Sequence, residues 1–237
     1  MTQRGIAALA FGPDLLHAPA GSPPRALAPM AQSSARPAPA HRLLLVRHGH
    51  YDRVAGLTDE QYGLSTLGRR QAARLGRRLA RHMEGCGGGL AGIFSSPWPR
   101  ALQTAEITAH ELGLDRVRVK PYLFECVTVI SGDDPLTMSL GLPQTTDEDR
   151  FVTEARLEKI TDRFFRPARR DTTSMIFAHG NLIRYLVAMA CGLPLETWVR
   201  MEICHASLTE LRVFPGGLVT LHRYNDTGHL PDSLTSS

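Results

Sequence analysis

Residues 43–49 read Leu-Leu-Leu-Val-Arg-His-Gly, an apolar run that stops at an arginine, a histidine and a glycine. A continuous apolar run without polar alternation is typical of a parallel strand that is buried on both faces. Such a strand carries Arg47 and His48 to one edge of its sheet. A second run, Met175–Ala178, stops in the same way at His179 and a glycine. The two histidines are therefore predicted to meet at one site.

Strand and helix patterns alternate along the rest of the chain. Two runs at 207–214 and 218–224 flank Pro215-Gly216-Gly217, which is typical of a hairpin. The alternation predicts an α/β fold, a three-layer α/β/α sandwich with a mostly parallel sheet and an antiparallel C-terminal hairpin. Four further strands are expected at 43–46, 91–95, 117–120 and 173–178, and helices at 67–83, 99–112, 147–164 and 181–191.

The sequence also predicts one helix cap and the core residues of one helix. Ser65 is expected to cap the first helix, because its hydroxyl can accept a hydrogen bond from a free backbone N–H. In the helix at 147–164, Phe151 and Phe164 are expected to be core residues. The segment 126–144 is rich in Gly, Pro and Asp, and no element is assigned to it.

Composition divides the chain into one domain and two tails. The first 40 residues contain seven of the 16 prolines, and such a stretch cannot supply a packed core. We expect a disordered tail at 1–40, one domain at 41–231 and a C-terminal tail at 232–237. The apolar run that ends at Gly12 is short for an export signal. The stretch 182–195 is interrupted by arginine, glycine and proline, so no membrane association is expected.

The four cysteines have no CxxC spacing, and most of them lie in or beside apolar runs. This usage favours free thiols in a reducing compartment. A cytoplasmic location is therefore predicted.

Other polar residues follow the expected strands at corresponding points. Arg100 opens the helix after the second strand, and Glu125 follows the third. The carboxyl ends of strands in an open α/β sheet form one rim, where ligands bind. The site is therefore predicted to contain Arg47, His48, Arg100, Glu125 and His179.

This set of side chains is suited to phosphoryl transfer. Arginine guanidinium groups match the geometry of phosphate oxygens, and the helix that starts at Gly180 offers backbone N–H groups. The nearby cations lower the pKa of His48, so the imidazole remains a neutral nucleophile. Arg47, Arg100, His179 and Gly180 are the predicted substrate-binding residues. The reaction needs neither a metal ion nor a cofactor.

Four stretches together resemble the histidine phosphatase superfamily, also called phosphoglycerate mutase-like. They are Leu-Val-Arg-His-Gly at 45–49, Ser-Ser-Pro-Trp-Pro-Arg-Ala-Leu-Gln-Thr-Ala at 95–105, Leu-Phe-Glu at 123–125 and Ala-His-Gly at 178–180. The resemblance covers residues 42–231. It implies that His48 carries the phosphoryl group, that Arg47, Arg100 and His179 form the phosphate pocket, and that Glu125 donates the proton.

Within the family, the sequence favours the phosphatases. The long segment and the Gly-Glu-Ser element of the cofactor-dependent mutases are missing, and residues 199–231 are similar to protein-serine/threonine phosphatase members. The predicted function is metal-independent phosphomonoester hydrolysis through a phosphohistidine. The alternatives are a mutase-type phosphoryl-transfer isomerase and a non-catalytic phosphate-binding scaffold. The expected partner is a phosphorylated small molecule or phosphoprotein.

Three further groups of side chains are not assigned to the active site. His48-x-His50-x-Asp52 resembles the start of a dinuclear metal site, but Arg53 stands where a further ligand is expected. His205 and Trp198 are interpreted as packing residues. A solvated helix face, rather than nucleic-acid binding, is expected for Arg69, Arg70, Arg74, Arg77, Arg78 and Arg81.

Overall fold

A computed structural model describes residues 38–84, 88–126, 135–139, 141 and 144–237. Within these residues six strands form one sheet in the order β3-β2-β4-β1-β5-β6. Neighbours among β1 to β4 pair in parallel, whereas β5 is antiparallel to both β1 and β6. This arrangement confirms the predicted fold class. The strands are β1 His41–Arg47, β2 Gly89–Ser95, β3 Val117–Val119, β4 Thr172–Ala178, β5 Leu208–Val213 and β6 Val219–Asp226.

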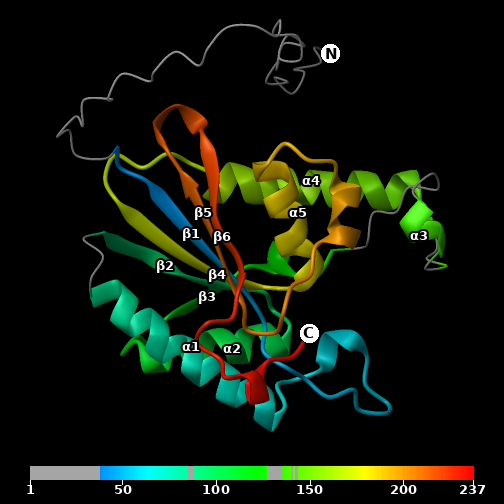
Figure 1. Ribbon diagram of the computed structural model, residues 1–237, viewed down its shortest axis with the longest axis horizontal. Coiled ribbons are helices and arrows are strands. Elements are labelled where there is room, and N and C mark those ends of the chain that lie inside the picture. Colours follow the sequence, from blue (N-terminus) through cyan, green and yellow to red (C-terminus); the bar gives the residue numbers. More distant parts are fainter. Residues whose placement is uncertain (1–37, 85–87, 127–134, 140, 142–143) are drawn as a thin grey trace, which may run out of the picture. The chain divides into compact units, whose positions relative to one another are not determined.

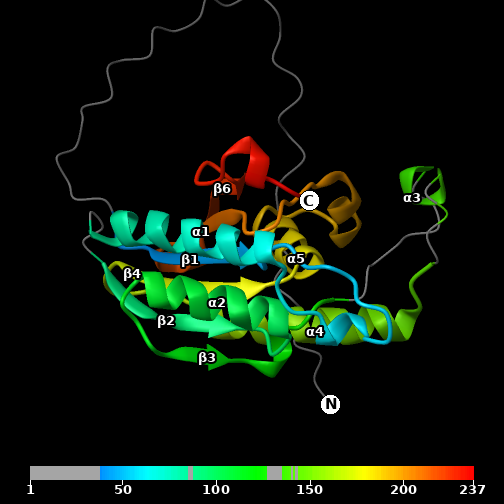
Figure 2. The ribbon, with the colours of Figure 1, turned by 90° about the horizontal axis from the view of Figure 1, so that it is seen from below.

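Helices cover both faces of the sheet (Figures 1 and 2). On one face lie α1 (Thr66–Glu84) and α2 (Pro99–Glu111), and on the other lie α4 (Asp147–Phe164) and α5 (Gly180–Ala190). A short helix, α3 (Pro135–Ser139), falls in the segment to which the sequence assigned no element. The sheet is thus the middle of three layers.

The apolar run at the start of the domain is buried from both sides. Leu43 and Leu45 pack in the core under α4 and α5, while Leu44 and Val46 pack in the core under α1 and α2. Each of the four is at most 1% exposed. Successive side chains of a strand point to opposite faces, so a strand between two helical layers needs apolar residues at every position. Each such side chain contributes about 1.5–3 kcal/mol by leaving water.

Local signals fix where the helices begin and end. The Ser65 hydroxyl accepts a hydrogen bond from the backbone N–H of Gly68 at 3.1 Å, as expected of a cap. Thr146 does the same for Asp149 at the start of α4, also at 3.1 Å. After α2, Gly113 has a φ of +69°, a conformation that glycine adopts without strain.

The predicted core face of α4 is wrong at Phe151, whose side chain is 71% exposed. Phe164 is a core residue as predicted, and Leu157 and Ile160 are buried with it, each of the three at most 1% exposed. At about 100° per residue, Ile160 and Phe164 share one face, whereas Phe151 projects about 140° away from Phe164. The periodicity therefore holds for the last two turns of α4, and Phe151 lies outside it.

The last residues of the chain pack against the domain. Leu234 is 3% exposed, and its carbonyl accepts a hydrogen bond from the Gln71 amide at 2.7 Å. The segment 232–237, expected as a tail, therefore contributes contacts to the fold. Nearly all of the predicted N-terminal tail, residues 1–37, lies outside the described residues. No helix in the described ranges combines the length and apolar character needed to cross a bilayer.

Candidate active site

The predicted site residues of three strands come together at one edge of the sheet. Arg47 ends β1, and His179 directly follows β4, which pairs with β1 in parallel. The imidazole centroids of His48 and His179 lie 5.2 Å apart. Arg100, in the first turn of α2, places its Nε 3.1 Å from the Nε2 of His48. The fold thus assembles the cluster that the strand ends predict.

A backbone carbonyl fixes the hydrogen-bonding state of His48. The Nδ1–H donates to the Gly49 carbonyl at 2.9 Å, which leaves the lone pair of Nε2 to accept from Arg100. His48 is 3% exposed. Burial lowers its pKa well below the usual value, and the charges of His179, Arg47 and Arg100 lower it further. The imidazole is therefore neutral at neutral pH, with Nε2 unprotonated and directed into the cluster.

Close packing against α1 explains the glycine after His48. A Cβ on Gly49 would lie 2.7 Å from the carbonyl oxygen of Gly68, and a Cβ on Gly68 would lie 2.1 Å from that of His50. Both distances are shorter than atoms tolerate. The 48–50 loop and the first turn of α1 therefore approach at backbone distance, which holds His48 rigidly.

Arg47 is anchored by the loop before β5. Its Nη1 donates to the Ile203 carbonyl, and its Nη2 donates to Nε2 of His205 at 3.1 Å. Its Nε is buried and has no hydrogen-bond partner in the described part of the chain. Gly180 lies next to it, since a Cβ there would be 3.6 Å from that Nε. An unpaired buried donor is costly, so this N–H is a ready contact for a bound anion.

Arg100 is held between two aromatic rings and an acidic residue. Its guanidinium carbon lies 4.7 Å from the ring centroids of both Tyr51 and Trp98. Its Nη1 and Nη2 donate to the carbonyl and to Oδ2 of Asp59, the latter at 2.8 Å. The Asp59 side chain is 52% exposed, whereas that of Arg100 is 3% exposed. A half-exposed carboxylate thus covers the cation that the sequence assigned to the phosphate pocket.

His179 presents one free nitrogen to the cluster. Its Nε2 is hydrogen-bonded to the Ser96 hydroxyl at 2.8 Å, while Nδ1 is buried without a partner in the described residues. Burial lowers its pKa well below the usual value, and Arg100 and Arg47 add to the effect. His179 and Arg47 therefore place two unpaired polar atoms near His48.

Glu125 occupies the N-terminus of α5, which corrects one prediction. The backbone N–H groups of Gly180 and Asn181 were expected to bind substrate phosphate, but that of Asn181 donates to the Glu125 carboxylate at 3.3 Å, as does that of Leu182 at 3.1 Å. The Cys126 N–H also donates to it, at 2.9 Å. Burial raises the pKa of Glu125, against these hydrogen bonds and the Arg47 charge. The carboxyl group is therefore held in place and more basic than an exposed one.

His205 belongs to the cluster, although its sequence context indicated a packing residue. Its ring centroid lies 5.6 Å from that of His48, and its Nε2 accepts from Arg47. The Nδ1–H then donates to the Ser236 hydroxyl at 3.1 Å. Burial lowers the pKa of His205 to about 3, with Arg47 the next cause. No sequence signal marks this histidine, because it follows no strand and is brought in by the turn before β5.

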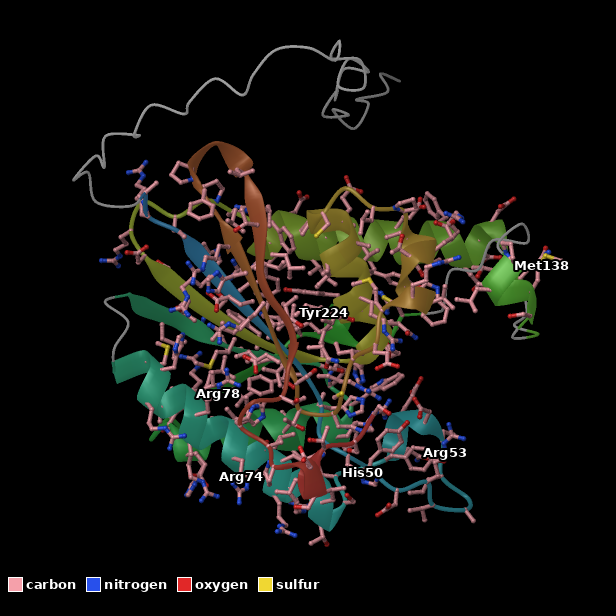
Figure 3. All side chains as sticks on the ribbon, in the orientation of Figure 1. His50, Arg53, Arg74, Arg78, Met138 and Tyr224 are labelled. Carbon is pink, nitrogen blue, oxygen red and sulfur yellow. The ribbon has the colours of Figure 1, made fainter. Side chains whose placement is uncertain are left out.

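The side chains that were considered as metal ligands, His50 and Asp52, make other contacts in the structure. His50 directs Nδ1 to the Ser65 hydroxyl at 2.8 Å, and its distance to the Asp52 carboxylate is 4.0 Å (Figure 3). Asp52 is 72% exposed. Over the described ranges, no three His, Cys, Asp or Glu side chains are arranged to hold a metal ion.

The arginines of α1 lie away from this cluster of side chains. Arg74 is exposed, while Arg78 pairs with Asp226, with Nη1 2.9 Å from Oδ1 (Figure 3). This pair lowers the pKa of Asp226. Arg78 thus joins α1 to the end of β6, and only part of the arginine set is a free solvated face.

Comparison with known proteins identifies the same motifs. The family model of the histidine phosphatase superfamily (branch 1) matches residues 43–130 and 141–227. The mitochondrial serine/threonine-protein phosphatase Pgam5 of Drosophila mojavensis is 36% identical over 198 residues, which are 81% of this chain and 65% of that protein. The chain therefore spans about two thirds of the length of this relative.

Solved structures share the fold. A mycobacterial glucosyl-3-phosphoglycerate phosphatase matches with a TM-score of 0.59 and 26% identity, over 78% of this chain and 99% of that one. The phosphoglycerate mutase of Plasmodium falciparum matches with a TM-score of 0.55 and 22% identity, over 82% and 96% of the two chains. The second likeness concerns the fold alone.

The relatives confirm one functional prediction and contradict another. They are named as phosphatases, in agreement with the predicted class. The Pgam5 relative is also named as mitochondrial, which contradicts the predicted cytoplasmic location. That prediction rested on free cysteines, which indicate a reducing environment without naming the compartment. From the matched motifs and the shared fold, the chain belongs to the histidine phosphatase superfamily.

Proposed function

We propose that this chain hydrolyses phosphomonoesters without a metal ion, through a phosphohistidine on His48. The observation that carries the proposal is the neutral imidazole of His48, whose Nε2 accepts a hydrogen bond from Arg100 and whose ring lies 5.2 Å from that of His179. A neutral nitrogen in a cationic pocket can attack phosphorus while the pocket stabilises the equatorial oxygens. Residues 41–231 form the catalytic domain in this proposal.

Binding uses the donors that the fold leaves unpaired. The Arg47 Nε–H and the His179 Nδ1, in its protonated tautomer, contact phosphate oxygens beside His48. Gly180 lies beside the first of these donors, since a Cβ there would be 3.6 Å from the Arg47 Nε. Arg100 donates to a third oxygen after the phosphate takes the place of the Asp59 carboxylate on its guanidinium.

The reaction then proceeds in two displacements. The Nε2 of His48 forms a bond to phosphorus, and the ester P–O bond breaks. The leaving alkoxide takes a proton from Glu125, whose pKa burial has raised toward that of a useful acid. A water molecule next gives its proton to Glu125 and attacks the phosphohistidine. Inorganic phosphate leaves and His48 is free again.

The Pgam5 relative supports a phosphorylated protein as the substrate. The Drosophila mojavensis relative is a serine/threonine-protein phosphatase, so phosphoserine and phosphothreonine proteins are the proposed substrate class. Its name also supports a mitochondrial location for this chain. A mutase reaction is less favoured, because the Gly-Glu-Ser element of the mutases is missing from the sequence.

Trapping the intermediate tests the proposal. Wild-type protein and His48→Ala are mixed with a ³²P-labelled phosphopeptide and quenched after milliseconds. The expected result is a protein-bound label that resists alkali and is released by acid in the wild type alone. His110→Ala, an exposed histidine on α2, is the matched control. Equal hydrolysis of p-nitrophenyl phosphate by wild type and His48→Ala contradicts the proposal, as does loss of activity with EDTA and recovery with zinc or manganese.

A further inference from the structure

A groove lies beside α4 and leads away from the candidate active site. It consists of two adjoining cavities of about 620 and 510 Å³, which share Tyr122, Ala155 and Lys159. Its floor is apolar and aromatic, and its walls carry cations. We define the α4 groove by the lining residues Lys120, Tyr122, Phe124, Ala155, Lys159 and Arg163.

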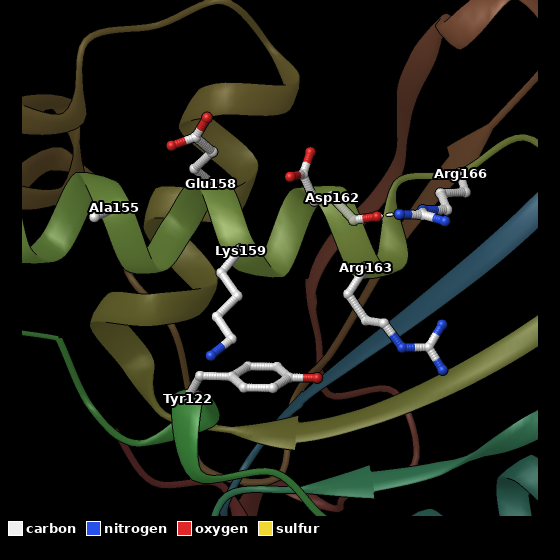
Figure 4. Close-up of a pocket in the computed structure, with 7 residues that line it drawn as sticks. All are labelled: Tyr122, Ala155, Glu158, Lys159, Asp162, Arg163 and Arg166. Carbon is white, nitrogen blue, oxygen red and sulfur yellow. Dashed lines mark hydrogen bonds between the residues drawn. The ribbon is translucent and has the colours of Figure 1, made fainter.

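Charge is separated across α4 at this groove (Figure 4). Lys159 and Arg163 project toward Tyr122, while Glu158 and Asp162, which form the outer rim, project from the opposite side of the helix. The Lys159 ammonium lies 5.2 Å from the Tyr122 ring centroid. In the described residues neither Lys159 nor Arg163 pairs with a carboxylate. Like charges four positions apart weaken a helix, so this pair lowers the stability of α4 by their mutual repulsion.

An aromatic path connects the α4 groove with the active site. Phe124 is 39% exposed in the groove, and its ring stacks with that of Trp98 at a centroid distance of 6.4 Å. The Trp98 ring in turn lies 4.7 Å from that of His179. Arg156 places its guanidinium carbon 4.0 Å from the Phe124 centroid and donates to the Glu125 carbonyl at 3.3 Å. The groove is therefore linked to His179 through the Phe124 and Trp98 rings.

The groove has the dimensions of a short extended peptide. The cations of α4 run from Arg156 to Arg166, a span of about 15 Å at 1.5 Å per residue. An extended chain covers that span with about five residues. Exposed Val119 and Phe124 offer apolar contacts between the charges, and β3 is an edge strand of the sheet. A groove of this length, with apolar side chains between its cations, fits one acidic peptide strand better than a lipid surface or a nucleic-acid duplex.

We propose that the α4 groove binds an acidic segment of a phosphoprotein substrate, beside the phosphorylated residue in the active site. The inference rests on the phosphatase activity proposed above and adds its selectivity. Acidic side chains of the substrate pair with Lys159 and Arg163, while the phosphoryl group lies between Arg47 and Arg100. Selection by exposed cations acts on substrate capture and weakens with salt.

Two phosphopeptides test the groove. They share one phosphoserine core and differ only in flanking residues, with either Glu or Gln at the five positions on each side. For the wild type, kcat/KM is expected to be about tenfold higher with the acidic peptide, through KM, and the advantage disappears in 0.5 M salt. In Lys159→Glu/Arg163→Glu the preference is lost, while p-nitrophenyl phosphate hydrolysis is unchanged. Arg70→Glu/Arg74→Glu on α1, with the same spacing and exposure, retains the preference.

A binding measurement separates this proposal from the activity itself. Fluorescence anisotropy of the labelled acidic phosphopeptide with His48→Ala is expected to show binding that Lys159→Glu/Arg163→Glu weakens about tenfold. If the wild type hydrolyses p-nitrophenyl phosphate but shows no preference between the two peptides, the proposed role of the groove is wrong and the phosphatase activity stands. If no hydrolysis occurs but peptide binding depends on Lys159 and Arg163, the proposed phosphatase activity is wrong and the role of the groove stands. A different result also overturns the proposal. In it, Lys159→Glu/Arg163→Glu still binds the peptide but no longer binds phosphatidylserine vesicles or single-stranded RNA, so the two cations serve another ligand.

Discussion

The active-site cluster and the α4 groove both combine arginines with aromatic rings, yet they hold their cations differently. Arg47 and Arg100 are bound through backbone carbonyls and a histidine, with their side chains largely excluded from water. Lys159 and Arg163 are exposed and rest near rings without a carboxylate partner. Buried and oriented charge stabilises a transition state, whereas exposed charge is screened and selects partners weakly. The difference indicates chemistry at one region and recognition at the other.

The largest effect is expected from removing a buried cation. Arg100→Ala should lower kcat/KM for p-nitrophenyl phosphate by about 100- to 1000-fold, as expected when one preorganised donor is lost. Arg163→Ala, the groove counterpart, should change it by less than about twofold. Steady-state kinetics of both variants checks the contrast. Similar losses in the two would break the division between the regions.

Glu125→Gln is expected to act according to the leaving group. Hydrolysis of phenyl phosphate or a phosphoserine peptide should fall by about 100-fold, because a poor leaving group needs the proton. Hydrolysis of p-nitrophenyl phosphate should fall much less. A Brønsted plot of kcat/KM against leaving-group pKa measures this, and its slope should steepen in the variant. Parallel plots for wild type and variant would remove Glu125 from the role of acid.

The buried histidines should make stability depend on pH. The native pKa of His205 is about 3, whereas the unfolded residue titrates near 6.5. Between these values the unfolded state binds the extra proton, so stability is present above pH 6.5 and is lost as pH falls. His205 alone contributes about 2 kcal/mol to the loss at pH 5. Urea unfolding from pH 7.5 to 5 should show a shallower decline in His205→Asn, while Lys159→Gln should retain the wild-type slope.

His205 should have a smaller effect on catalysis, through its hydrogen bond to Arg47. His205→Ala is expected to lower kcat/KM about tenfold, because one end of the guanidinium loses its acceptor. His205→Asn, whose amide oxygen can accept the same bond, should recover much of the activity. Inhibition by vanadate should weaken in parallel. If Asn fails where Ala does not, or if both match the wild type, His205 does not position Arg47.

Strands and helices were predicted correctly where residues close together in the sequence are sufficient to determine them. The continuous run at 43–46 and the second run before His179 demanded burial on both faces, and the sheet places them in its centre. Capping at Ser65 and the start of α2 at Pro99 depend on neighbouring residues only. Phe151 was misassigned because hydrophobicity, without its angle around α4, was taken as burial.

Contacts between distant segments were beyond such patterns. Asp59, which accepts a hydrogen bond from Arg100, lies in a loop of short 3₁₀ and irregular structure. Glu125 accepts hydrogen bonds from N–H groups of α5, which are far from it in the chain. Both bonds depend on how the loops meet above the sheet edge. The predicted phosphate contact of the Asn181 N–H is wrong for this reason, since a carboxylate of the same protein already accepts its hydrogen bond.

The layered fold, the family and the convergence of Arg47, His48, Arg100 and His179 could be read from the chain alone, because strand periodicity and chain order decide which residues leave the sheet at one edge. The free nitrogen of His48, the unpaired donors, and the places of His205 and the α4 groove beside the site became visible only in three dimensions. These properties depend on distances of a few ångströms between segments remote in sequence, and no local pattern encodes them.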